Sequence, residues 1–175
     1  MPEAAVPTAP DGVALAEEFW TFAVAFYARA EVAADCLRLQ DEHGLDVNIL
    51  LLCCFLAGSG RGRLTAADLA AAEARAAPWR AGVIAPLRAA RRALKTMSSS
   101  TSSPAANALY AEIKRSELAA EREEQRLLLA SWSAPPFPSS DPIGDAAASL
   151  ALYLITHGLP AEAGDTLIRA LHTTT

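Results

Sequence analysis

Asp46-Val47-Asn48-Ile49-Leu50-Leu51-Leu52-Cys53-Cys54-Phe55-Leu56-Ala57 is the stretch that decides the fold of this 175-residue chain. Its last nine residues, 49 to 57, are all apolar, so a helix over them has no polar face and must be buried on every side. A helix that crosses a membrane needs about 20 apolar residues, which is more than this run supplies. We therefore predict a short central helix, with Asp46 as its N-cap and Gly58 as its end.

The composition predicts helices throughout the chain. Apolar residues make up 52% of the sequence, and alanine, which favours helix, supplies much of that fraction. Runs of Val, Ile, Thr and Tyr, which are typical of strands, are missing. We predict an all-α irregular bundle of about six or seven helices around the central one. The expected further helices cover 15–28, 32–43, 66–77, 79–95, 105–132, 141–157 and 161–171.

Proline and serine positions suggest how the chain is divided. Residues 1–12 contain three prolines and no apolar run, and we expect a disordered leader rather than a signal peptide. Residues 13–132 are predicted to form the bundle, with a Ser-rich linker at 96–104 and a break or kink at Pro78. Residues 141–172 are predicted to form a helical hairpin that packs on the bundle as a C-terminal appendage.

Charge and cysteine content restrict the classes of partner. The net charge is −5 and the isoelectric point is near 5.2, which argues against a nucleic-acid partner. Two of the three cysteines are adjacent in the apolar run, so they indicate reduced core residues of a cytoplasmic protein rather than a disulfide framework. We expect no cofactor and no membrane association, and we expect a protein partner or a homodimer.

Several motifs occur together in the first three quarters of the chain. They are Trp20-x-Phe22 with Tyr27, then Cys36-Leu37-x-Leu39-Gln40-Asp41-x-x-Gly44-x-Asp46-Val47-Asn48, then Pro78-Trp79-Arg80 with Pro86-Leu87-Arg88 and Arg91-Arg92-x-Leu94-Lys95, and the acidic run 117–125. This set resembles an uncharacterised bacterial family, known only as a domain of unknown function, from about Leu15 to Leu128. The resemblance implies a bacterial cytosolic protein, and it brings no activity and no catalytic residues.

An acidic and a basic group of residues border two predicted apolar stripes. Glu117 and Glu124 flank the stripe of one helix, with Glu121 a little further round, and Arg80 and Arg91 flank the stripe of another. Because a buried charge without a partner is costly, we predict that at least one of these arginines pairs with at least one of these glutamates.

Three other cations are expected on the opposite, solvated side of their helix. These are Arg88, Arg92 and Lys95. The alternative is that the whole basic run, Arg80, Arg88, Arg91, Arg92 and Lys95, binds an acidic protein or a ligand that bears phosphate.

No metal site is predicted. His43 lies near Asp41 and Asp46, but paired ligands at the short spacing of zinc sites are missing, and adjacent cysteines do not readily bind one ion together. We expect Asp41, Asp46 and Asn48 to fix the turn between two helices instead.

Two functions remain open. The favoured hypothesis is a non-catalytic binding or adaptor protein that acts through a helix surface. The alternative is a small-molecule-binding or enzymatic bundle with a pocket near Trp20, Tyr27, Glu117 and Glu124. A deep pocket lined by these side chains would favour the second, and a large exposed apolar patch would favour the first.

Overall fold

The computed structural model describes residues 12–100, 103–130, 132 and 138–173. These residues form helices and no strand, with the bounds α1 Gly12–Tyr27, α2 Ala30–His43, α3 Val47–Gly58, α4 Ala66–Trp79, α5 Ala85–Ser100, α6 Pro104–Leu129, α7 Pro142–Thr156 and α8 Asp165–His172. A π-helical turn, Arg80–Ile84, joins α4 to α5, and a 3-10 turn, Ala161–Gly164, leads into α8. With joined elements counted once, the described residues form seven helical segments, so the predicted all-α irregular bundle is confirmed.

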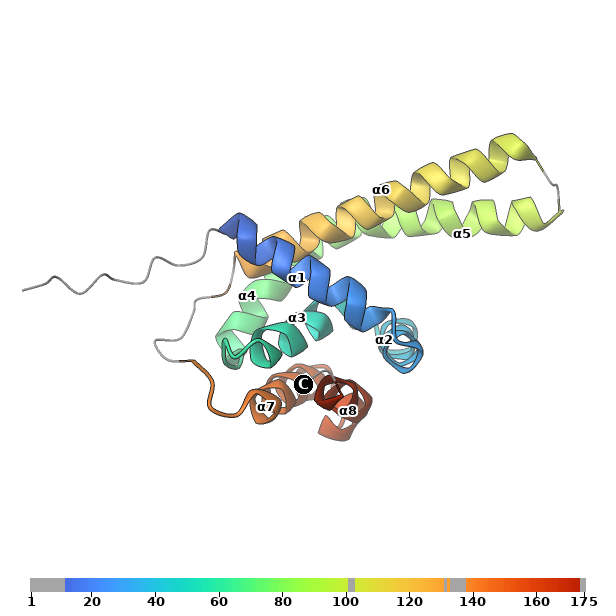
Figure 1. Cartoon of the computed structure of the whole chain (residues 1–175). Helices are drawn as coiled ribbons and strands as arrows, with labels where there is room; N and C mark the ends of the chain where they lie inside the picture. The colour runs from blue at the N-terminus through green and yellow to red at the C-terminus, as the bar shows by residue number, and fades with distance from the viewer. Residues whose placement is uncertain (1–11, 101–102, 131, 133–137, 174–175) are drawn as a thin grey trace, which may run out of the picture.

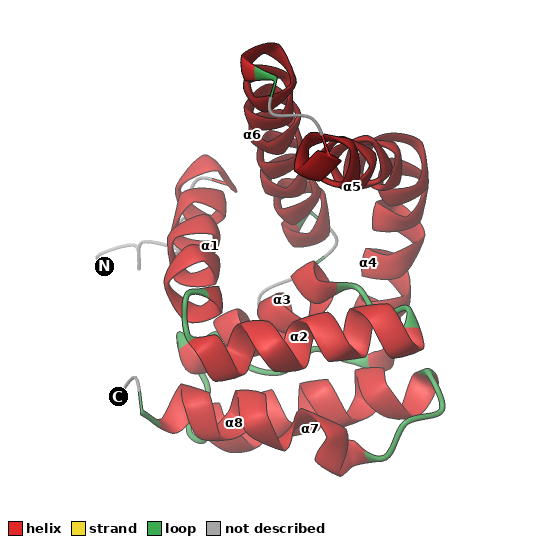
Figure 2. Ribbon diagram, turned by 90° about the vertical axis from the view of Figure 1, so that its right-hand side faces the viewer, coloured by secondary structure: helices red, strands yellow, loops and turns green. Residues whose placement is uncertain are grey.

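Helix α3 is the centre of this bundle, as its sequence predicts. Each residue from Ile49 to Ala57 is at most 3% exposed, and α3 packs against α1, α2, α4, α6, α7 and α8 (Figures 1 and 2). The Asp46 side chain caps the helix by accepting a hydrogen bond of 2.8 Å from the backbone N–H of Asn48. Phe55 stacks on Phe19 of α1 with ring centroids 5.0 Å apart.

The C-terminal hairpin packs on the bundle and shares its hydrophobic core. Leu150, Tyr153 and Leu154 of α7 are at most 1% exposed and belong to one hydrophobic cluster with α3. The Tyr153 hydroxyl also accepts a hydrogen bond of 3.0 Å from the backbone N–H of Asp46. The reason is that α3 is apolar all round, so the helices of 13–132 alone leave one of its faces to be covered by α7. Of the predicted leader, only Gly12, which begins α1, lies within the described residues.

The predicted linker at 96–104 is shorter than expected, because α5 continues to Ser100 and α6 begins at Pro104. Serine lowers helix stability only slightly, so a serine run does not by itself end a helix. Ser103 instead caps α6, since its hydroxyl accepts a hydrogen bond of 3.4 Å from the backbone N–H of Ala106. Helix α4 also continues through Pro78 to Trp79, and the π turn follows directly.

Helices α5 and α6 run side by side and extend beyond the rest of the molecule (Figure 1). We call residues 85–116 the arm. None of its described side chains is buried, in contrast to α6 from Glu117 onward, which reaches the core. The arm therefore projects away from the core, and the candidate site lies where the arm joins the bundle.

Candidate functional site

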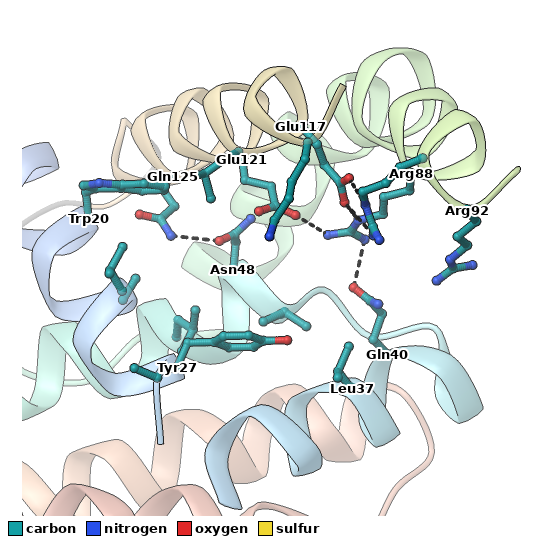
Figure 3. A pocket seen from close by; sticks show the side chains of 18 residues that line it. Trp20, Tyr27, Leu37, Gln40, Asn48, Arg88, Arg92, Glu117, Glu121 and Gln125 are labelled. Carbon is teal, nitrogen blue, oxygen red and sulfur yellow. Dashed lines mark hydrogen bonds and ion pairs between the residues drawn. The ribbon is translucent and has the colours of Figure 1, made fainter. Parts of the chain in front are cut away.

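A cleft of about 520 Å³ lies between the bundle and the helix pair α5–α6 (Figure 3). Helices α1, α2 and α3 form its floor, and α5 and α6 form its roof. The lining residues are Trp20, Ala23, Val24, Tyr27, Ala28, Leu37, Gln40, Val47, Asn48, Leu51, Arg88, Arg91, Arg92, Lys114, Glu117, Leu118, Glu121 and Gln125. Volumes of 300–1,000 Å³ are typical of small-molecule sites.

The floor of the cleft is apolar and aromatic. It includes the two aromatic residues that the sequence singled out for a pocket, Trp20 and Tyr27, together with Leu37, Val47 and Leu51. The Tyr27 ring extends across the floor beneath the polar roof (Figure 3). Burial raises the pKa of the Tyr27 hydroxyl, and so do nearby acidic groups, so this group stays protonated and able to donate a hydrogen bond.

The roof is built from ion pairs, among them one that helical spacing predicted. Arg91 forms an ion pair with Glu117 through its Nε atom. Arg88 reaches three acceptors: its Nη2 lies 2.7 Å from Glu121 Oε1, its Nη1 donates to Gln40 Oε1 at 2.8 Å, and its Nε lies 3.3 Å from Glu117 Oε1. The prediction that Arg88 lies on the solvated side is therefore wrong, because this side chain turns inward toward the carboxylates of α6 (Figure 3).

A second polar cluster is buried behind the cleft, where α3 meets α6. The Arg80 Nε atom lies 3.0 Å from Asp46 Oδ2 and 3.7 Å from Glu124 Oε1. Asn48 donates from Nδ2 to Glu124 Oε2 at 2.6 Å. Burial and, after it, the neighbouring Asp46 raise the pKa of Glu124 to about 8, against the opposing effect of Asn48 and Arg80.

The acceptor atoms of this cluster indicate a shared proton. Asp46 Oδ2 and Glu124 Oε1 are both buried without a hydrogen-bond partner, although their carboxyl groups lie within hydrogen-bonding reach of each other. The Nε–H of Arg80 lies near these oxygen atoms but is not aligned to donate a hydrogen bond to them. A proton on Glu124 would satisfy both oxygen atoms at once, which agrees with the raised pKa of this group.

Two amide side chains connect the cluster to the cleft. Gln125 donates from Nε2 to Asn48 Oδ1 at 2.9 Å, and Asn48 in turn donates to Glu124. The carbonyl Oε1 of Gln125 has no donor, although Gln125 is only 3% exposed and lines the cleft. A buried acceptor without a partner at a cavity wall is a place where a ligand or a water molecule can donate.

Residues 18–128 match the family described as "Protein of unknown function (DUF2390)". The chain belongs to this family. The predicted resemblance to a domain of unknown function is therefore confirmed. The match includes every residue that lines the cleft, from Trp20 to Gln125, and it ends before α7. No curated protein and no solved structure matches the chain.

Not every predicted residue of this DUF2390 chain reaches the cleft. Arg80, Glu124 and Asp46 belong to the buried cluster behind it, and Asn48 belongs to both, because it lines the cleft and donates to Glu124. Asp41 is exposed on α2, and its Oδ1 atom lies 3.7 Å from Arg92 Nη2. Asp46 caps α3 and thereby fixes the turn, whereas the side chain of Asn48 contacts α6.

Sequence reasoning missed the contributions of Gln40, Arg88 and Gln125 to this DUF2390 site. Gln125 directly follows Glu124, and Arg88 precedes Arg91 by almost one helical turn, so both are neighbours of residues that were predicted for the site. Gln40 gave no such signal, because its role depends on how α2 sits relative to α5.

The three cysteines of this DUF2390 chain are free and buried. Burial raises the pKa of the Cys36 and Cys53 thiols to about 12 and raises that of Cys54 as well. Within the described residues, no three His, Cys, Asp or Glu side chains come together in a way that could hold a metal ion. In the same part of the chain, no helix combines the length and the apolar character needed to cross a membrane.

Proposed function

We propose that this DUF2390 chain is a non-catalytic binding protein that holds a small organic molecule in the cleft between α1–α3 and α5–α6. The observation that carries this proposal is the cleft itself, with an apolar floor on one side and a polar roof on the other. Sites for small molecules commonly combine an apolar lining with a few placed polar groups.

A polar group and an aromatic surface of the cleft also support binding. The hydroxyl of Tyr27, which stays protonated, offers a donor to a ligand in the cleft. Trp20 adds an aromatic surface at the α1 side, where Arg122 lies over its ring at 5.4 Å from the centroid. An organic molecule with an apolar or aromatic body can therefore contact the floor and accept the hydrogen bond from Tyr27.

Binding is favoured over catalysis because the charged groups of the roof already neutralise one another. Glu117 is paired with Arg91 and Arg88, and Glu121 with Arg88. A general base must be free to take a proton from the substrate, whereas these carboxylates are each engaged by a guanidinium group. These ion pairs are therefore suited to holding the roof of the cleft in a fixed shape.

A fluorescence titration with two neutral probes, dansylamide and 1-decanol, tests this proposal, with 1-decanol followed by its displacement of dansylamide. We expect saturable binding of one probe molecule per chain. Val24→Trp should weaken binding at least about 10-fold, because Val24 lines the cleft and an indole would fill it. The matched control is Val13→Trp on the same helix, at a position that is 76% exposed and outside the cleft. Absence of saturable binding, or equal affinity in both variants, would refute the proposal.

A second candidate function is favoured by the arm: docking of an acidic helix from a protein partner. A shallow hollow runs along α6 and is lined by Ala108, Ala111, Glu112, Lys114, Arg115 and Leu118. Small alanines allow another helix to come close, Leu118 is 50% exposed, and two cations stand beside it on a chain whose net charge is −5.

This candidate predicts binding of a designed acidic amphipathic peptide, measured by fluorescence anisotropy. Arg115→Glu should weaken that binding, whereas Arg75→Glu, the same charge change at an exposed position of α4, should not. Equal binding of the acidic peptide and its charge-reversed form would contradict the docking function. A stable homodimer, detected by light scattering, in which a second copy covers the hollow would contradict it as well.

A further inference from the structure

The charge of the cleft is opposite to the charge of the chain. Its lining contains four cationic side chains, Arg88, Arg91, Arg92 and Lys114, and two carboxylates, those of Glu117 and Glu121. The whole chain carries a net charge of −5. A concave surface with locally reversed charge concentrates ligands of the opposite sign.

Two of the four cations are already neutralised within the roof. Arg91 is paired with Glu117, and Arg88 is paired with Glu121 at 2.7 Å and with Glu117 at 3.3 Å. Both side chains are about one quarter exposed or less, at 25% and 22%. These pairs use both carboxylates of the lining, so the positive charge that remains belongs to Arg92 and Lys114.

Arg92 and Lys114 line the cleft from α5 and α6, and both are exposed. Arg92 is 63% exposed, and its only ion pair among the described residues is the long one of 3.7 Å with Asp41, itself 58% exposed. Such surface pairs contribute little energy and are exchanged easily. Lys114 has no ion-pair partner within the part of the chain that the structure describes. Both ammonium and guanidinium groups are thus available to a ligand.

The two cations complement the floor. An apolar body that covers Tyr27, Val24 and Leu37 extends toward the roof, where Arg92 lies at the same end of the cleft as Leu37 and Gln40 (Figure 3). A ligand that also carries a negative group can place it between the two helices of the arm. Charge-assisted hydrogen bonds from arginine and lysine are the usual means by which such groups are held.

We infer that the ligand of this cleft is a small organic carboxylate, with an apolar or aromatic body on the α1–α3 floor and its carboxylate held by Arg92 and Lys114. This inference rests on the proposed binding function and names the class of ligand for the same site.

Two matched probe pairs test the inference: dansylglycine against dansylamide, and decanoate against 1-decanol. In each pair the bodies are closely similar and one member carries a carboxylate. We expect the carboxylate to bind roughly 10-fold or more tightly at low salt, the factor that a charge-assisted hydrogen bond contributes. Salt at 0.5 M should reduce this preference, because the two cations are exposed enough to be screened.

Four variants test which residues cause the preference for the carboxylate probes. Arg92→Gln and Lys114→Gln should each lower the preference for the carboxylate several-fold and together remove it, measured as the ratio of the two affinities within each pair. Asp41→Asn should raise it, because Arg92 then loses its competing carboxylate. Lys95→Gln, on the same helix as Arg92 but outside the cleft, is the control and should have no effect.

The outcomes separate the two proposals. If neither member of either pair binds, the proposed binding function itself fails. If neutral and anionic members bind equally, or if the preference survives the double variant, the cleft binds small molecules but the carboxylate inference is wrong. A preference for 1-decanol over decanoate would exclude an anionic ligand altogether.

Discussion

Glu124→Gln is expected to make the protein more stable at neutral and alkaline pH and to remove a large part of its pH dependence. Glu124 is 1% exposed, it accepts a hydrogen bond of 2.6 Å from Asn48, and burial raises its pKa to about 8. In the folded protein it therefore keeps a proton that it shares with Asp46. Glutamine has the same shape, and its amide N–H can take the place of that proton.

The sign and size of the effect follow from proton binding. The pKa of Glu124 is raised from an ordinary value of 4.5 to about 8, so between these pH values the folded state holds a proton that the unfolded chain has released. Stability contributed by this proton is fully present below pH 4.5 and is lost as the pH rises toward 8. Each pH unit in this window lowers the free energy of unfolding by about 1.4 kcal/mol, so the total loss is roughly 5 kcal/mol. Glutamine cannot titrate and does not incur this loss.

Urea denaturation followed by tryptophan fluorescence at pH 5, 6, 7 and 8 measures the difference between wild type and variant. We expect similar free energies of unfolding near pH 5 and an increasing advantage of Glu124→Gln above it, because all other titrating groups cancel in the difference. Glu123→Gln is the matched control: its carboxylate faces Arg126 at the surface and has a lowered pKa. Parallel pH profiles of wild type and Glu124→Gln, or a variant that is less stable at pH 8, would show that Glu124 is ionised in the folded protein and would refute the shared proton.

Three further predictions concern the core and the roof. Leu52→Ala should lower the free energy of unfolding by about 2–5 kcal/mol, because Leu52 is fully enclosed; a loss under about 0.5 kcal/mol in urea denaturation would contradict the central position of α3. Cys53 and Cys54 should not react with a thiol reagent under native conditions and should react after unfolding, since burial raises the pKa of both thiols; rapid native labelling would contradict this. Arg88→Met should destabilise the fold more than Arg88→Met combined with Glu121→Gln, because the single variant leaves a half-buried carboxylate without its guanidinium. If thermal denaturation shows that the effects of the two substitutions simply add, the pair does not contribute to the stability of the fold.

The sequence was sufficient for features that depend on local chemistry. Nine consecutive apolar residues have only one stable environment, so α3 and its burial could be predicted without any knowledge of its neighbours. The Asp46 cap follows equally from one side chain and the first amides of the helix. The pairing of Arg91 with Glu117 could be predicted because both border apolar stripes that must face one core.

The direction of Arg88 could not be predicted in the same way. The inner side of α5 consists of Leu87, Arg88, Arg91 and Leu94, all half-buried, so two arginines occupy positions where an apolar residue is expected. They are tolerated there because α6 supplies carboxylates at the same level. A search for an apolar stripe places Arg91 at its border but assigns Arg88 to solvent. The cleft could not be predicted from the sequence either, because it depends on how the arm is oriented relative to the bundle and not on any single element.

The two walls of the cleft are held by different forces, and this determines which substitutions can separate binding from folding. The floor belongs to the core: Leu51 is 3% exposed and lies on the helix that packs against six others, so a change there alters stability and binding together. The roof above the cleft meets the floor through polar contacts such as the hydrogen bond from Arg88 to Gln40, whereas the C-terminal part of α6 also packs in the core through Leu128 and Leu129. Arg92 and Lys114 are exposed and take no part in those contacts. Substitution of these two residues therefore changes the charge that a ligand meets while the wall itself stays in place, which makes them the positions at which the function of the cleft can be tested with the fold intact.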